Sequence, residues 1–154
     1  MSQISLAEVP AQPVAVVRRT VQMSELSGFY STALGTVAAA VANAGGVVTG
    51  PAFGWYHGIP TGSVDVAAGF PVSGVADGPL AGEVVVLERP ACLAVAAMHV
   101  GSFEALAETY RELEAWLNDR QLDRAEHSWE EYLSDPQTQP DPADWQTRIV
   151  WPLA

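Results

Sequence analysis

The chain has 154 residues, of which 49% are hydrophobic and 16% are charged, and its formal net charge at pH 7 is −11. This length and composition are typical of one folded domain covering residues 1–154 and not of a disordered chain. All seven basic residues are arginine. Such an acidic chain would repel phosphate backbones, so we expect no direct binding to DNA or RNA, whereas cationic small molecules are favoured partners.

The sequence also disfavours several other classes of protein. No apolar run approaches the roughly 20 residues of a membrane helix, and the first residues carry no signal-peptide pattern, so we expect a cytoplasmic protein. The single cysteine, Cys92, lies in an apolar run and is expected to be a buried, inert thiol. The three histidines lie too far apart in the sequence to form a metal-binding pair. We therefore expect neither a metal nor a cofactor.

The first half of the chain reads as four strands and one helix. Ser24 is a favourable N-cap for the helix, which Gly45 and Gly46 end. The helix carries an apolar stripe at helical spacing. The stripe comprises Leu26, Phe29, Tyr30, Ala33, Leu34, Val37, Ala38 and Val41. The predicted strands are 4–9, 14–21, 51–57 and 64–72, followed by a connection over 73–82.

The second half has the same order of elements. Ser102 is the predicted N-cap of the second helix, and residues 134–144 are a loop by composition. The apolar stripe of this helix comprises Phe103, Leu106, Ala107, Tyr110, Leu113 and Leu117. The predicted strands are 83–88, 92–100, 129–133 and 145–153.

The two halves also match residue by residue. A shift of 80 residues places Leu26 on Leu106, and a shift of 76 places Tyr56 on Tyr132. We therefore predict an α+β fold of duplicated βαββ units, about 1–75 and 80–154, related by a pseudo-twofold axis. Each unit would have an antiparallel sheet covered on one face by one helix, and the other faces would build a central ligand cleft.

A single acid stands out in residues 127–136, which read as a strand ended by Asp135-Pro136. Alternation along the strand places Glu130 and Tyr132 on one face. The opposite face, with Trp129, Glu131 and Leu133, is predicted to be the helix-covered core face. Glu131 fits it poorly and would need a mid-strand bulge or an edge position. The alternative is that Glu130 is a solvated residue of an edge strand.

If the alternation holds, Glu130 occupies the position that Gly54 occupies in the first half. The small glycine would leave room for a guest molecule, and Tyr56 and Tyr132 would form aromatic walls. A buried carboxylate without a partner is costly, so a cationic guest or a hydrogen-bond donor would stabilise it. Trp145 and Trp151 share a strand face and are candidates to roof the cleft.

Several segments together resemble the GyrI-like effector-binding domain, found in DNA gyrase inhibitor-like proteins and at the C-termini of MerR- and AraC-type regulators. The segments are Gly50-Pro51-Ala52-Phe53-Gly54-Trp55-Tyr56-His57, Asp65-Val66-Ala67-Ala68-Gly69-Phe70-Pro71-Val72, His99-Val100-Gly101-Ser102-Phe103, Trp129-Glu130-Glu131-Tyr132-Leu133-Ser134-Asp135-Pro136 and Thr147-Arg148-Ile149-Val150-Trp151-Pro152-Leu153. The resemblance covers essentially the whole chain. It implies a cleft that binds hydrophobic, often cationic, small molecules, with Glu130 as the central acid.

Three functions are compatible with this pattern. The first is a stand-alone domain for binding or sensing small molecules, as in multidrug recognition or transcription regulation, with no DNA-binding domain in these residues. Its ligand-binding residues would be Glu130, Tyr132, Tyr56, Trp55, Trp145 and Trp151. The second is a hydrolase of strained electrophiles in which Glu130 orients or deprotonates water and Tyr132 or Tyr56 donates a hydrogen bond to the departing group. The third is inhibition of a protein partner such as gyrase, which rests on the family analogy alone.

Overall fold

The computed structural model describes residues 3–58, 62–134 and 140–154. Within these ranges the chain forms ten strands, two α-helices and three short 3-10 helices, an α+β architecture with antiparallel strand pairing. Two compact units account for the chain. Unit 1 comprises Met1–Val9 and Cys92–Ala154, and unit 2 comprises Pro10–Ala91.

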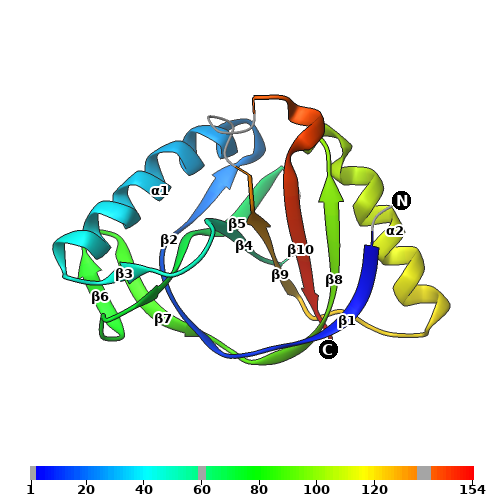
Figure 1. Cartoon of the computed structure of the whole chain (residues 1–154), viewed down its shortest axis with the longest axis horizontal. Helices are drawn as coiled ribbons and strands as arrows, with labels where there is room; N and C mark the ends of the chain where they lie inside the picture. Colours follow the sequence, from blue (N-terminus) through cyan, green and yellow to red (C-terminus); the bar gives the residue numbers. More distant parts are fainter. Residues whose placement is uncertain (1–2, 59–61, 135–139) are drawn as a thin grey trace. The chain divides into compact units, whose positions relative to one another are not determined.

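Unit 2 is a sheet with strand order β4-β5-β2-β7-β6, and β3 pairs with β5. Its helix, α1, lies along one face of β2 and β5 (Figure 1). The elements in chain order are β2 (Gln12–Gln22), η1 (Met23–Glu25), α1 (Leu26–Asn43), β3 (Val47–Val48), β4 (Phe53–His57), β5 (Ser63–Ser73), β6 (Gly78–Ala81) and β7 (Val84–Arg89).

The apolar stripe predicted for the first helix supplies the core of unit 2. Phe29, Ala33 and Val37 of α1 are buried against sheet residues that include Val17 and Val66. The helix ends at Asn43 and is followed by Gly45, whose φ of 80° is readily adopted by glycine because it has no Cβ.

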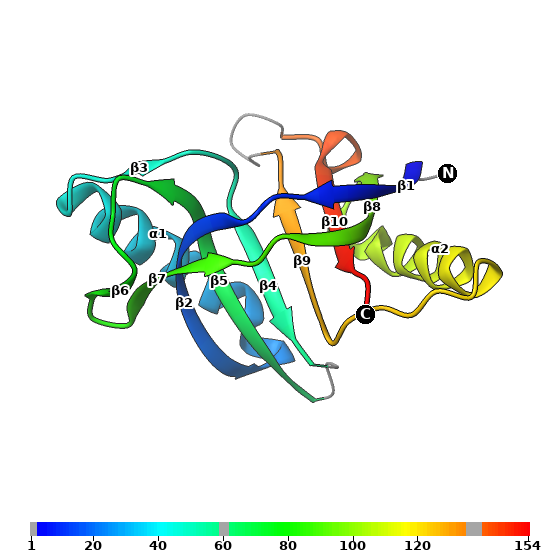
Figure 2. The ribbon, with the colours of Figure 1, turned by 90° about the horizontal axis from the view of Figure 1, so that it is seen from below.

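Unit 1 is a sheet with strand order β1-β8-β10-β9, in which the first strand of the chain pairs along the whole length of β8 except its end (Figure 2). The elements are β1 (Gln3–Val9), β8 (Cys92–Val100), η2 (Phe103–Ala105), α2 (Leu106–Asp119), β9 (His127–Tyr132), η3 (Pro142–Asp144) and β10 (Gln146–Pro152). The predicted strand over residues 4–9 is therefore confirmed, and its partner is the strand that begins at Cys92.

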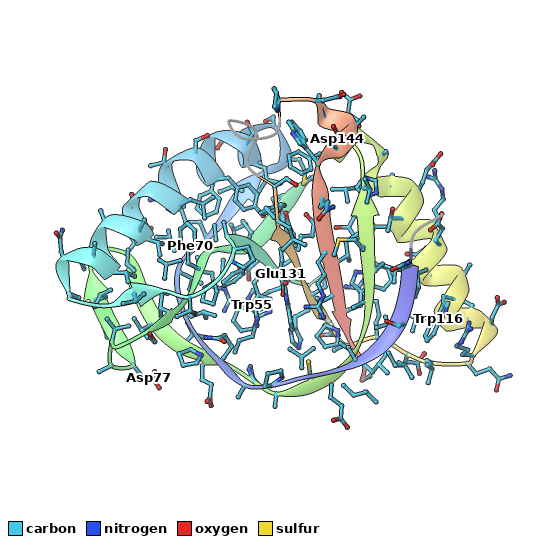
Figure 3. All side chains as sticks on the ribbon, viewed as in Figure 1. Trp55, Phe70, Asp77, Trp116, Glu131 and Asp144 are labelled. Atoms are coloured by element: carbon cyan, nitrogen blue, oxygen red, sulfur yellow. The ribbon has the colours of Figure 1, made fainter. Side chains whose placement is uncertain are left out.

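Helix α2 covers one face of the unit 1 sheet. Leu106, Leu113 and Leu117 pack with Val95 and Ile149 of the strands in one apolar cluster. Trp116, labelled on α2 in Figure 3, lies partly buried at the margin of this cluster. The strict alternation of β8 and β10 thus brings every second side chain under the helix.

Both α-helices begin later than the predicted N-caps indicate, at Leu26 and Leu106. Ser24 and Ser102 both precede or lie within a 3-10 turn, and neither side chain makes a capping hydrogen bond to its helix. Two short strands, β3 and β6, were not predicted, because β3 has two residues and β6 lies in a segment with Gly and Pro. Residues 59–61 and 135–139, part of the predicted connections, lie outside the described residues.

No helix in the described residues is long and apolar enough to cross a membrane.

Candidate functional site

The carboxyl group of Glu130 lies on the face of the unit 1 sheet that α2 covers. In the register of β9 with β10, Glu130 is opposite Ile149 and Tyr132 is opposite Thr147. Directly opposed residues of antiparallel strands point to the same face, and Ile149 belongs to the apolar cluster under α2. The prediction that Trp129 and its neighbours form the helix-covered face is therefore wrong.

The other face of β9 accommodates the second acid. Glu131 accepts a hydrogen bond from Trp129 Nε1 at 2.9 Å and pairs with Arg148, its cross-strand neighbour, at 3.4 Å. Glu131 is labelled in Figure 3. Because Glu131 has these partners on its own face, no bulge is needed to explain it.

Glu130 is buried, with 6% of its surface exposed, so it is not a solvated residue of an edge strand. Burial raises the pKa of its carboxyl from 4.5 to about 7, and a hydrogen bond donated by Tyr132 opposes that rise. The Tyr132 hydroxyl lies 3.0 Å from Glu130 Oε1. A carboxyl with a pKa near neutrality can exist as an acid or as a carboxylate, so a bound charge can change its protonation.

Aromatic side chains gather at the end of β9 beside Tyr132. The ring of Phe103 meets Tyr132 edge-on at a centroid distance of 5.9 Å and lies 4.9 Å from the ring of Trp145. A backbone hydrogen bond from Gly101 to the Trp145 carbonyl, 2.8 Å long, joins the turn before α2 to the start of β10. Phe103 is 45% exposed, so these rings present an aromatic surface and not only core.

Trp151 lies further along the same face of β10, where it is buried and stacks on Tyr110 of α2 at 5.7 Å with an interplanar angle of 14°. The guanidinium of Arg124 lies 4.0 Å from the Trp151 ring. Desolvation lowers the pKa of Arg124. Of the predicted residues in unit 1, Glu130 and Tyr132 are joined by a hydrogen bond, and Trp151 lies on their face of the sheet. Phe103 contacts both Trp145 and Tyr132.

In unit 2 the two predicted residues point to opposite faces of β4. Tyr56 packs with the α1 core and its hydroxyl lies 2.6 Å from that of Tyr30. Trp55 is buried on the other face, where its ring lies 4.7 Å from that of His57. Trp55 and Tyr56 therefore do not form one continuous surface.

The space beside Gly54 is filled by a protein side chain. A Cβ at this position would come within 1.8 Å of the Tyr30 hydroxyl. The prediction that Gly54 leaves room for a guest is therefore wrong: the glycine allows the phenol of α1 to approach the strand. Cys92 also departs from expectation, since it is only partly buried.

Two residues on the Glu130 face were missed by sequence reasoning. Phe103 was assigned to the apolar stripe of the helix, although it precedes α2 in a 3-10 turn. Thr147 was not singled out, although it is the one polar residue in the alternating series Trp145, Thr147, Ile149 and Trp151. A single polar residue in this apolar series was the sequence signal by which Thr147 could have been identified as a candidate site residue. Among the described residues, no cluster of three or more His, Cys, Asp or Glu suits a metal ion.

Comparison with known proteins places these observations in a family. The family model for the GyrI-like small molecule binding domain matches residues 2–154. No curated protein matches the sequence.

Solved structures share the fold. The C-terminal domain of EcmrR has a TM-score of 0.86 and 24% identity, with coverage of 100% of this chain and 98% of that chain. In the EcmrR–DNA complex the match covers 57% of the EcmrR chain, so this chain spans little more than half of that protein. SAV2435 bound to tetraphenylphosphonium has a TM-score of 0.70 and 11% identity, with coverage of 99% and 94%. A hydrolase from Listeria innocua has a TM-score of 0.68 and 15% identity, with coverage of 99% and 92%.

Proposed function

Because this chain belongs to the GyrI-like small-molecule-binding domain family, we propose that its ligand is a hydrophobic cation held beside Glu130. The observation that carries the proposal is the buried carboxyl group of Glu130, on a face lined by aromatic rings. It accepts a hydrogen bond from Tyr132, and its pKa is raised to about 7. We propose both that Glu130 is the acid beside the bound cation and that the aromatic rings contact the ligand.

The charge of the ligand follows from the electrostatics of Glu130. An ionised carboxylate is disfavoured by burial, and one hydrogen bond from Tyr132 only partly offsets the lost hydration. A cation beside the carboxylate supplies the missing interaction. A neutral hydrocarbon ligand would gain apolar contacts but would leave the acid protonated.

The shape of the ligand follows from the rings. Phe103, Trp145 and Tyr132 offer faces and edges for stacking and for cation–π contacts, which contribute about 0.5–2 kcal/mol each. Such contacts tolerate ligands of different shape, as expected for multidrug recognition. The tetraphenylphosphonium complex of SAV2435, a protein of the same fold, supports the choice of this ion as a first probe.

Isothermal titration calorimetry with tetraphenylphosphonium at pH 8 tests the proposal. We expect Glu130→Gln to weaken binding by about tenfold or more, which is ~1.4 kcal/mol, because the variant keeps the side-chain shape and removes the charge. Glu131→Gln is the matched control, since it removes the neighbouring acid from the opposite face; its affinity should stay within about twofold of wild type. Equal weakening by both variants, or binding unaffected by either, would refute the role of Glu130.

We also propose that the two units derive from a duplicated βαββ element. The strand order β4-β5-β2 with α1 in unit 2 and β9-β10-β8 with α2 in unit 1 supports it. Whether Trp55 and Tyr56 contact the ligand, as the sequence predicts, is measured by the same titration on Trp55→Ala and Tyr56→Phe. A role in regulation, by analogy with EcmrR, would require a DNA-binding partner and is tested by co-purification.

A second candidate function is hydrolysis. The observation in its favour is the same pKa of about 7, which suits a general base at neutral pH, with the Tyr132 hydroxyl at 3.0 Å as a donor. A Listeria innocua protein of this fold is described as a hydrolase. Consumption of a strained electrophile in excess over protein, abolished by Glu130→Gln, would establish turnover; stoichiometric binding without product would refute it.

A further inference from the structure

Thr147 carries a buried hydroxyl for which the folded chain provides no hydrogen bond. Its side chain is 0% exposed, and Oγ1 has no partner among the residues that the structure describes. Leaving a buried hydroxyl unpaired costs free energy, and valine would fill the same volume without that cost. The choice of threonine at this position therefore needs a reason other than packing.

The position of Thr147 suggests the reason. It is opposite Tyr132 on β9, so it shares the face of Glu130 and lies one residue pair away from it. Trp145, whose ring contacts the exposed Phe103, lies two residues before Thr147, just ahead of β10. A ligand that passes from the aromatic surface towards Glu130 along β10 would meet the Thr147 side chain first.

The nearest polar groups on the neighbouring strand are already used. Opposite Thr147 on β8 is His99, whose Nε2 lies 2.9 Å from the Ser102 carbonyl and must donate to it. In that tautomer His99 Nδ1 accepts from the Thr109 hydroxyl, 2.8 Å away. Neither ring nitrogen is therefore available for Thr147.

We propose that the Thr147 hydroxyl donates a hydrogen bond to the ligand. The ligand class is then organic cations that carry a hydrogen-bond acceptor, such as a carbonyl or ether oxygen. The acceptor should lie about 7–8 Å or less from the charge, because Thr147 and Glu130 are diagonal neighbours on adjacent strands and this is the usual spacing of such positions. This inference rests on the proposed function, because Glu130 supplies the site for the charge. It adds that a purely hydrocarbon cation leaves one buried hydroxyl unsatisfied.

Trp151 points to the same class of ligand. Its Nε1 is likewise buried without a partner among the described residues, and it lies two positions beyond Ile149 on the Glu130 face. An indole N–H can only donate, so any group that satisfies it must be an acceptor. Trp151 is held by stacking on Tyr110, which makes Thr147 the better residue to change in an experiment.

The test uses two probes that differ in one group: a phenylalkyl trimethylammonium ion, and the same ion with one chain methylene replaced by a ketone. Calorimetry with the full chain measures both affinities in wild type, Thr147→Val and Thr147→Ser. We expect wild type to prefer the ketone by about fivefold, the ratio that one net hydrogen bond provides. Thr147→Val should abolish the preference without weakening the hydrocarbon ion, and Thr147→Ser should retain it.

The outcomes separate this inference from the proposed function. If both ions bind and Glu130→Gln weakens both, but Thr147→Val keeps the ketone preference, the inference about Thr147 is overturned and the proposed function stands. If neither ion binds wild type, both are overturned. Thermal unfolding of each variant accompanies the titrations: Thr147→Val should be at least as stable as wild type, so lost preference cannot be attributed to unfolding.

Discussion

Glu130 should make the protein less stable as the pH rises, and Glu130→Gln should remove that loss. The pKa of the folded carboxyl is raised to about 7 from 4.5, so the folded state favours the protonated form. Below pH 4.5 the acid is protonated in both folded and unfolded chains and costs nothing. Between pH 4.5 and 7 the unfolded chain releases its proton first, and the free energy of unfolding falls.

The size of the effect follows from the two pKa values. A difference between 4.5 and about 7 corresponds to roughly 3 kcal/mol of lost stability once the pH is above 7. Glutamine has almost the same shape, carries no charge and can still accept a hydrogen bond from Tyr132. Glu130→Gln should therefore be more stable than wild type at pH 8.5, by up to roughly 3 kcal/mol, and similar to it at pH 4.5.

Urea denaturation of both proteins without ligand, at these two pH values, measures the difference. Comparing variant with wild type at each pH cancels the general repulsion of an acidic chain. Glu131→Gln is the control: it breaks the ion pair with Arg148 but leaves Glu130 in place, so the loss of stability with pH should persist. A Glu130→Gln effect that is the same at both pH values would refute the assignment of a raised pKa.

Three further predictions follow from the same structure. The affinity for tetraphenylphosphonium should rise about tenfold from pH 6 to pH 8, because the ionised fraction of Glu130 rises from about 0.1 to 0.9, and calorimetry with no pH dependence would contradict it. Gly69→Ala should destabilise unit 2 severely, by more than ~3 kcal/mol, because its Cβ would lie 1.8 Å from the Ala15 backbone oxygen; a two-state urea curve near that of wild type would exclude this. Gly54→Ala should cost less, about 1–3 kcal/mol, because the clashing atom is the Tyr30 hydroxyl at the end of a side chain, and a larger loss than for Gly69→Ala would contradict the reasoning.

Periodicity predicted the elements well, because both helices and most strands bury one side. The helical stripe that contains Phe29 and Val37 is the buried face of α1, and strands 92–100 and 145–153 appear as β8 and β10 with nearly the same limits. The order of the elements in each half followed from the same patterns, whereas the family was identified by the resemblance of whole segments such as residues 50–57 and 129–136.

Alternation alone did not reveal which strand face the helix covers. Trp129 and Glu130 are adjacent and both buried, so the more apolar face of β9 is not the one under α2. The sequence favoured the tryptophan side because hydrophobicity was the only criterion available. Deciding between the faces needs the register with Ile149, which is a long-range fact.

The site was predicted in part for a similar reason. The spacing of two residues along the strand correctly predicted that Glu130 and Tyr132 lie on one face, where they form a hydrogen bond. The contact of Phe103 with Trp145 depends on a backbone hydrogen bond between residues far apart in sequence, and the filling of the Gly54 position depends on a side chain from the preceding helix. No local pattern encodes either contact.

The pairing of β1 with β8 has a consequence for biosynthesis. Unit 2 is a continuous stretch, Pro10–Ala91, and all its strands are available once that stretch has left the ribosome. Unit 1 combines β1, which precedes unit 2, with strands that follow unit 2, so its sheet is completed only after β10 has been made. During translation β1 must wait for its partner β8 while the more than eighty residues of unit 2 are made, and the acid-bearing strand β9 becomes part of a finished sheet only after β10 has been made.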